Sequence, residues 1–167
     1  SKGFEVLAFR VPEPGRSGQR LAGHFLQQLR CTEAGTLRAV IPELAKIRAL
    51  GTDILWVMPV QPIGIKGRKG TLGSYYSVRD YTAVNPEFGT LADAKAFVAA
   101  AQKLGFKVIL DWVANHTAWD HPWATAHKAR YKLNAQGEVF PVTFNEGQPS
   151  VEYWTDVIGL DYRNEGL

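Results

Sequence analysis

The chain has 167 residues, which is enough for one domain with a hydrophobic core and short for two. Its net charge of +3 comes from lysines and arginines scattered along the chain, so neither a nucleic-acid groove nor an anionic membrane surface is indicated. A single cysteine excludes an intrachain disulfide, and no apolar run approaches the roughly 20 residues that cross a membrane.

Residues 1–34 carry the weakest pattern, because prolines and glycines interrupt any long element. The pattern allows two short strands or extended pieces there, at 6–9 and 25–29. We treat this part as an amino-terminal segment with a poorly defined first strand. The regular pattern begins at residue 35.

The first regular pattern is helical. Thr36 is a suitable N-cap, apolar residues then recur at helical spacing as far as Leu50, and Gly51 is a typical stop. A continuous apolar run over 53–60 predicts a buried strand, because it has strand length and a proline close to its end. The glycine-rich segment 61–84 is predicted to be a long loop.

A second helix is predicted to open at Thr90, where Asp93 completes a variant of the capping box, and to end at Gly105. A second buried strand follows at once, over 106–113. The order strand, helix, strand, with long loops after each strand, predicts an α/β fold built from βαβ units. Function is then expected in the loops at the carboxyl ends of the strands.

The run from Asp111 to His116 is the most informative part of the sequence. It closes a buried strand with a carboxylate, an amide and an imidazole. Polar groups at such a place cost free energy unless they have partners or a function, so the run predicts a site. The alternative interpretation is a polar cap on the end of the strand.

Beyond His116 the sequence predicts an irregular excursion, because no periodic element is visible as far as Asp161. Aromatic rings stack on the apolar faces of sugars while carboxylates and amides bind sugar hydroxyl groups, so a carbohydrate cleft is one interpretation. The other is that the aromatic side chains form the core of a loop-rich subdomain. These aromatic residues are Trp119, Trp123, Tyr131, Phe140, Phe144, Tyr153 and Trp154.

Phosphate and metal sites are further possibilities for the loops that follow the two predicted strands. The basic, glycine-rich loop 64–71 lacks the Gly-Lys-Ser/Thr order of a Walker loop, so phosphate binding is not favoured. Three histidines and an aspartate between 116 and 127 do not have a compact zinc spacing. A hard cation is more credible, since Asn115 and Asp161 offer oxygen ligands and backbone carbonyls could complete a calcium shell.

Four motifs that occur in a fixed order give the chain a family resemblance. They are Asp53–Trp56, Gly73–Tyr81, Asn85–Thr90 and Asp111–His116. Over roughly residues 35–167 the sequence resembles the α-amylase family, glycoside hydrolase family 13. The resemblance implies a partial (β/α)8 (TIM) barrel, with the first three strands, two helices and an irregular subdomain inserted after strand 3.

The resemblance also implies a division of the chain and a set of residue roles. After the amino-terminal segment 1–34, residues 35–116 would be the βαβ part of the barrel and 117–167 the inserted, truncated subdomain. Four residues would bind substrate: Tyr76 would stack under the sugar at the cleavage subsite, Asp80 would brace that site, Asp111 would support it, and His116 would hydrogen-bond the same sugar.

A calcium ion (Ca²⁺) is implied as well. By the family's pattern Asn115 would be one of its ligands, with Asp161 a weaker match to the second. One departure concerns the sugar platform itself. The residue before Tyr76 is Tyr75, where family members usually have proline, and this removes a rigid turn.

The catalytic carboxylates are expected on barrel strands 4, 5 and 7, beyond Leu167. A retaining glycosidase needs two carboxyl groups about 5 to 5.5 Å apart, and no carboxylate in this chain matches those motifs. The resemblance therefore implies a fragment of a retaining glycoside hydrolase that acts on α-glucans or maltooligosaccharides and is inactive alone. The alternatives are a non-catalytic carbohydrate- or calcium-binding module, and an engineered or truncated scaffold without retained function.

An open sheet edge is expected in such a fragment. Unpaired backbone groups and apolar surface at that edge predict self-association, a partner that supplies the remainder of the barrel, or an unfamiliar fold in which the segment 1–34 covers the edge.

Overall fold

The computed structural model describes residues 5–10, 24–30, 35–144, 147 and 149–167. The chain divides into two compact units, which we describe separately. The first unit comprises Ser1–Val60 and Val84–Asp111, and the second comprises Gln61–Ala83 and Trp112–Leu167. The second unit is thus built from the two segments that follow the two predicted buried strands. The expected boundaries after residues 34 and 116 do not coincide with this division.

The predicted helix after Thr36 is present but interrupted. It consists of α1 (Leu37–Val40), the 3₁₀ turn η1 (Ile41–Glu43) and α2 (Leu44–Ala49). Thr36 caps α1, because its hydroxyl accepts a hydrogen bond from the amide of Ala39 at 3.2 Å. Gly51 follows α2 with a φ of 86°, as the stop signal predicts. Pro42 has no amide hydrogen, which favours the break at η1.

The second predicted helix is confirmed as α3 (Leu91–Lys103). The Asp93 amide donates to the Thr90 hydroxyl at 3.1 Å, and the Asp93 carboxylate accepts from the Thr90 amide at 2.9 Å. This capping box satisfies amide groups that a first helical turn leaves without helical partners.

None of the described helices is long and apolar enough to cross a membrane.

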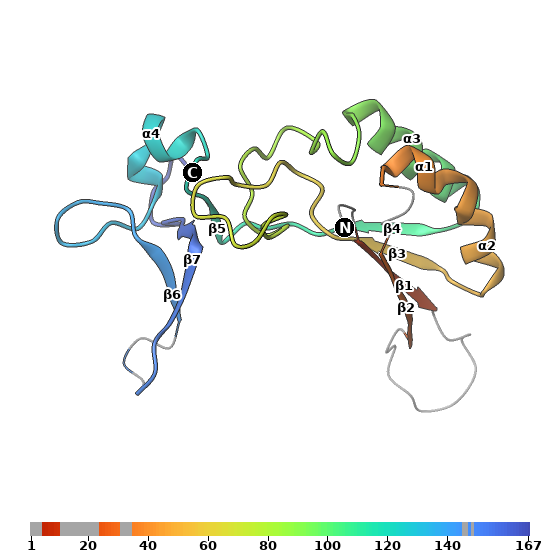
Figure 1. Ribbon diagram of the computed structural model, residues 1–167, viewed down its shortest axis with the longest axis horizontal. Coiled ribbons are helices and arrows are strands. Elements are labelled where there is room, and N and C mark those ends of the chain that lie inside the picture. The colour runs from red at the N-terminus through yellow and green to blue at the C-terminus, as the bar shows by residue number, and fades with distance from the viewer. Residues whose placement is uncertain (1–4, 11–23, 31–34, 145–146, 148) are drawn as a thin grey trace. The chain divides into compact units, whose positions relative to one another are not determined.

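The first unit contains a four-stranded sheet in the order β2-β1-β3-β4 (Figure 1). Its strands are β1 (Glu5–Arg10), β2 (His24–Arg30), β3 (Ile54–Val57) and β4 (Lys107–Leu110). β3 and β4 are parallel, as the βαβ pattern predicts, and both are shorter than expected. The expectation that the second strand is buried is wrong, because β4 is the end strand of the sheet and its Ile109 and Leu110 are 40% and 60% exposed.

The direction of β1 was not predicted from the sequence. β1 is antiparallel to both β2 and β3, so the sheet is mixed. Parallel strands require a crossover, usually through a helix. The helical segment 37–49 gives β2 and β3 the same direction, and β1 lies between them as an antiparallel strand.

The helices of the first unit lie together on one side of its sheet (Figure 1). Their connection is reinforced by the amide of Leu37, which donates to the carbonyl oxygen of Phe88 at 2.9 Å. The core is apolar and each of its main residues is at most 5% exposed: Leu37, Val40, Leu44, Leu55, Val57, Phe88, Phe97, Ala101 and Phe106.

The second unit contains a three-stranded antiparallel sheet, so the expectation of an irregular excursion over 117–160 is wrong. The strands are β5 (His116–Ala118), β6 (Pro141–Phe144) and β7 (Glu152–Gly159), in the order β5-β7-β6. Between β5 and β6 lie α4 (Trp123–Ala126) and the 3₁₀ turn η2 (Lys128–Arg130). The sequence signal was weak because β5 is very short and the β6–β7 register shifts, which disturbs the alternation of side chains.

The long loop 61–83 is attached to β5 by backbone hydrogen bonds. Gly64 donates to the carbonyl oxygen of Ser77 at 2.8 Å, which closes the loop, and Ala118 donates to that of Val78 at 2.8 Å. One hydrophobic cluster of this unit consists of three buried residues and four partly buried ones packed against them: Tyr131, Ile158 and Leu160, with Trp119, Trp123, Ala124 and Val139.

Candidate functional site

His116 is the buried centre of the candidate site. It lies at the start of β5, pairs with Gly159 of β7 and is only 4% exposed. Its Nε2 atom lies 3.1 Å from the backbone carbonyl oxygen of Tyr76, and its Nδ1 atom lies 3.0 Å from the side-chain amide nitrogen of Asn115. The structure therefore brings three of the predicted site residues together.

These two contacts fit one protonation state of the His116 ring. A carbonyl oxygen accepts and an amide NH₂ donates, so we assign the proton to Nε2 and the acceptor role to Nδ1. Burial lowers the pKa of His116, opposed by the Tyr76 carbonyl and by the charge of Asp156. The imidazole is thus neutral at neutral pH and holds the backbone of Tyr76 in place.

The Tyr76 side chain is 39% exposed, whereas its backbone is fixed by His116. A second tie follows five residues later. The Tyr81 hydroxyl lies 2.8 Å from the carbonyl oxygen of Val113 and 2.9 Å from that of His116, and burial raises the pKa of this phenol. The loop that carries the Tyr76 ring is thereby fastened to the start of β5 at two points.

Asp80 lies between these two tyrosines in the same loop and caps a turn. One of its oxygens accepts hydrogen bonds from the hydroxyl of Thr82 at 2.7 Å and from the amide of Thr82 at 2.8 Å. These two bonds are the main reason why the pKa of Asp80 lies below its ordinary value. Asp80 is therefore an anion that stiffens the loop, and its role in bracing a sugar site stays a prediction.

Asp111 is the one predicted site residue that belongs to the first unit. It follows β4 directly, and its amide donates to the carbonyl oxygen of Val57 at 3.0 Å, which extends the β3–β4 pairing. Its half-buried position at the carboxyl end of the strand is the one that the sequence predicts.

Asn115 and Asp161, the two predicted calcium ligands, are brought near each other by the backbone, because the Leu160 amide donates to the carbonyl oxygen of Asn115 at 3.1 Å. The Asp161 carboxylate, however, accepts two hydrogen bonds from the Arg163 guanidinium, at 2.8 and 2.7 Å. These bonds lower the pKa of Asp161 to about 2, with a smaller contribution from Lys132.

This donor set does not fit a calcium ion. Calcium takes about six to eight oxygen ligands, usually with several carboxylates. Here the predicted carboxylate is paired with a guanidinium, and the amide nitrogen of Asn115 faces His116. Within the described ranges of the chain, no three Asp, Glu, His or Cys side chains are grouped in a way that could hold a metal.

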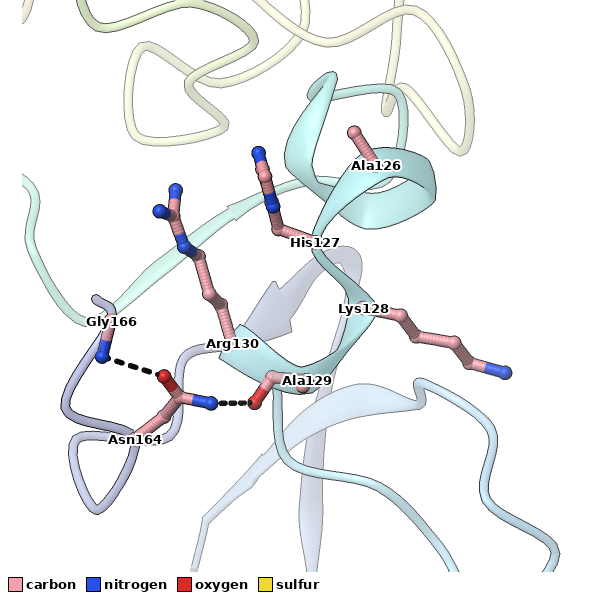
Figure 2. Close-up of a pocket in the computed structure, with 7 residues that line it drawn as sticks. All are labelled: Ala126, His127, Lys128, Ala129, Arg130, Asn164 and Gly166. Carbon is pink, nitrogen blue, oxygen red and sulfur yellow. Dashed lines mark hydrogen bonds between the residues drawn. The ribbon is translucent and has the colours of Figure 1, made fainter.

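A pocket of about 360 Å³ lies between η2 and the carboxyl-terminal turn. Figure 2 shows how Asn164 bridges its two walls, donating to the carbonyl oxygen of Ala129 at 2.9 Å and accepting from the amide of Gly166 at 2.8 Å. The side chains of His127 and Arg130 extend to the same side (Figure 2).

Arg68 lies in the glycine-rich loop that was weighed as a phosphate site. Its guanidinium donates to the carbonyl oxygens of Gly64 at 2.8 Å and Ile63 at 3.0 Å. This arginine therefore serves as a clamp on the backbone of its own loop.

Two further residues, Trp154 and His121, were considered in the sequence analysis but were not placed beside the predicted site residues. The Trp154 ring makes an edge contact with the His116 ring at a centroid distance of 5.8 Å. His121 is buried and packs against Tyr81 and Trp123, at 5.4 and 4.7 Å. Their aromatic character was visible in the sequence, but their shared location depends on the pairing of β5 with β7.

Comparisons with known proteins agree with the motifs. A family model described as alpha amylase, catalytic domain, matches residues 19–154. The crystal structure of an α-amylase from Lactobacillus plantarum is 45% identical to this chain, with a TM-score of 0.72, and the match covers 80% of this chain and 30% of that one.

Two curated relatives give a similar result. A trehalose synthase from Pimelobacter sp. is 38% identical over 95% of this chain, and an α-1,4-glucan:maltose-1-phosphate maltosyltransferase from Rhodospirillum rubrum is 33% identical over 91%. The chain spans about a quarter of their lengths, 26% and 24%. Because the family model matches most of its residues, the chain belongs to the α-amylase family, glycoside hydrolase family 13.

Proposed function

We propose that this chain is a part of an α-amylase-type retaining glycoside hydrolase that binds an α-glucan or maltooligosaccharide, and that alone it does not cleave the glycosidic bond. The observation that carries the binding proposal is the buried His116 ring, which fixes the backbone of Tyr76 while the Tyr76 side chain stays exposed. An exposed aromatic ring on a backbone that is held in place suits the stacking of a sugar.

The state of the carboxylates supports binding without hydrolysis. Retaining hydrolysis needs one carboxylate nucleophile and a second carboxyl group whose pKa is raised. The pKa values of Asp80 and Asp161 are lowered instead. Asp120 accepts from a backbone amide at 3.0 Å, and Asp156 lies 3.7 Å from the ammonium of Lys69. The carboxylates of Asp120 and Asp156 are thus held in contacts with groups of this chain.

The fold supports an assignment to the opening part of a (β/α)8 barrel. The family match begins at residue 19, so it includes β2 and excludes β1. β2, β3 and β4 run in the same direction, and helical segments join them in succession. We infer that these are the first three barrel strands, and that residues 112–167 belong to the subdomain inserted after the third.

Titration calorimetry with maltose and maltohexaose tests the binding proposal. We expect both sugars to bind the wild-type chain, and Tyr76→Ala to weaken binding about tenfold through the loss of stacking. Tyr153→Ala, which removes another exposed tyrosine of the second unit, is the matched control and should bind as the wild type does. A wild-type chain that binds neither sugar would overturn the proposal.

Hydrolysis of soluble starch and of a chromogenic maltooligosaccharide tests the proposed lack of activity on the same preparation. We expect no turnover by the wild-type chain. Turnover that co-elutes with the protein and disappears in the double variant Asp111→Ala, His116→Ala would mean that a complete active site is present.

We further propose that β4 is the surface through which the chain self-associates or contacts the remainder of the barrel. β4 is the last strand of its sheet, and Ile109 and Leu110 are 40% and 60% exposed. An apolar groove of about 310 Å³ lies beside it, lined by residues of α1, α3, β3 and β4. An open edge with exposed apolar side chains is a template for pairing with another chain.

Light scattering tests this surface. We expect a mass above that of the monomer for the wild type and a shift toward the monomer for Leu110→Lys, because a charge on an edge strand opposes pairing. Leu50→Lys, at a residue that is 65% exposed after α2, is the control. A monomeric wild type would leave the remainder of the barrel as the partner to be tested by co-expression.

A further inference from the structure

The pocket of about 360 Å³ beside η2 is lined by residues that do not belong to the site around His116. Among them are His127, Arg130 and Asn164. Figure 2 shows that the side chains of His127 and Arg130 extend to the same side of the turn, whereas that of Lys128 extends in another direction. The pocket thus presents two basic side chains on one side of η2.

The Arg130 guanidinium is held in place by an aromatic ring and pairs with no carboxylate. Its central carbon lies 4.7 Å from the centroid of the Trp123 ring, a cation–π contact that uses the face of the guanidinium and leaves the N–H donors at its edge available. The ion pairs among the residues that the structure describes do not include Arg130. Asp161 is near, because its amide donates to the Arg130 carbonyl oxygen at 2.8 Å, but its carboxylate pairs with Arg163 at 2.7 Å.

Three separate residues of the pocket offer hydrogen-bond donors. The Arg130 guanidinium can give two parallel N–H bonds to one anion, and His127 carries an N–H group in either protonation state. Asn164 donates one of its two amide hydrogens to the carbonyl oxygen of Ala129 at 2.9 Å, which leaves the second for a ligand. The lining therefore suits an anion with several acceptor atoms.

A phosphate group matches this set of donors. Its oxygen atoms form a tetrahedron, so they can accept from donors that approach from several directions, and a phosphate monoester carries about −1.5 to −2 charges at pH 7. A carboxylate has only two oxygen atoms, which lie in one plane and suit a single guanidinium. Three separate donors thus favour phosphate over a carboxylate.

We propose that Arg130, His127 and Asn164 bind a phosphate group, either as inorganic phosphate or as a phosphate monoester. Arg130 supplies the fixed charge and a bidentate contact, and the other two residues each supply one N–H donor. This site goes beyond the proposed function, because it does not involve Tyr76 and does not require a bound glucan. Phosphate binding and sugar binding can therefore fail independently of each other.

Equilibrium dialysis against radiolabelled inorganic phosphate, at constant ionic strength, tests the site. We expect the wild-type chain to bind phosphate and Arg130→Gln to weaken binding at least about tenfold, the loss of one charge-assisted contact. Lys128→Gln is the matched control, because it removes the same charge from the same turn at a side chain that extends elsewhere (Figure 2). It should weaken binding about twofold at most, since salt screens a charge that makes no direct contact.

Two further measurements define the ligand and the contact. Glucose 6-phosphate, added as a competitor, distinguishes the two sources of the phosphate group: displacement shows that the site takes a monoester, and phosphate binding without displacement shows that it takes free phosphate. Arg130→Lys keeps the charge but loses the bidentate geometry, so its affinity should lie between those of the wild type and Arg130→Gln.

Two results would overturn the phosphate site. The first is a wild-type chain that binds neither inorganic phosphate nor glucose 6-phosphate. The second is an equal loss of affinity in Arg130→Gln and Lys128→Gln, which would mean that only the general positive charge attracts the anion. Thermal unfolding shows whether Arg130→Gln keeps its fold without the contact to Trp123. If it does not, His127→Ala, at an exposed side chain, takes its place, and an unchanged affinity in that variant would overturn the site.

Discussion

The Nε2 atom of His116 lies 3.1 Å from the carbonyl oxygen of Tyr76, forty residues earlier in the chain. This hydrogen bond joins the loop 61–83, which follows β3, to β5, the first strand after β4. It requires a proton on Nε2, and burial keeps the ring neutral. The candidate site therefore depends on which tautomer one buried side chain adopts.

The stability of the chain should fall as the pH decreases from about 7 to about 5. The folded-state pKa values of His116 and His121 are lowered from 6.5, so below 6.5 the unfolded state binds more protons than the folded state does. The stabilisation is thus present above pH 6.5 and is lost as the pH falls toward the folded-state pKa values of the two histidines.

Urea unfolding across this pH range measures the loss of stability. His116→Gln should flatten the profile, whereas the exposed His127→Gln should not; equal slopes for both variants would contradict the prediction.

Tyr81→Phe should destabilise the second unit by about 1 to 3 kcal/mol, because it leaves buried carbonyl groups of Val113 and His116 without their donor. The same change should weaken maltose binding, since the Tyr76 loop loses one of its two ties to β5. Urea unfolding and calorimetry measure the two effects. Tyr153→Phe, at a side chain that is 58% exposed, is the control, and an unchanged midpoint in Tyr81→Phe would refute the prediction.

Gly64→Ala should disturb the attachment of the loop to β5. A Cβ atom at this position would lie 2.5 Å from the Ala118 Cβ and 2.9 Å from the Ser77 hydroxyl, both well within van der Waals contact. Overpacking of this kind costs about 1 to 3 kcal/mol. Gly159→Ala should be tolerated far better, because its new Cβ would meet nothing closer than 3.6 Å. The free energies of unfolding of both variants provide the measurement.

Thr90→Ala should destabilise the first unit by about 1 kcal/mol, through loss of the hydroxyl that accepts from the Asp93 amide. Thr90→Ser keeps this acceptor and should behave as the wild type does. Thermal unfolding followed by circular dichroism tests the pair. If the two variants melted at the same temperature, the capping box would not be what stabilises the start of α3.

Calcium should have no effect on the melting temperature of the wild-type chain, because Arg163 already neutralises the Asp161 carboxylate. Adding Ca²⁺ or a chelator tests this directly. A rise in melting temperature with Ca²⁺ concentration would show binding to the folded state and would favour the calcium site that the family resemblance implies. Arg163→Gln removes the competing cation and is the variant in which such a rise is most expected.

Local signals in the sequence predicted the two helices, the two parallel strands and the polar residues after the second strand. The helix ends are marked by Thr36, Thr90 and Gly51. Each threonine accepts a hydrogen bond from a nearby helix amide, and the glycine ends the helical hydrogen-bonding pattern. The run from Asp111 to His116 was recognisable for a similar reason, since an apolar strand that ends in three kinds of polar group is a local feature.

The tertiary structure decided what these residues contact. Only the pairing of β5 with β7 places Trp154 against His116, and only the return of the 61–83 loop brings the Tyr76 carbonyl to the same ring. The antiparallel direction of β1 and the pairing of Asp161 with Arg163 were likewise absent from the expectations. Strand pairing joins residues that are distant in the chain, and the free energy of such contacts depends on burial and register, which no short stretch of sequence specifies.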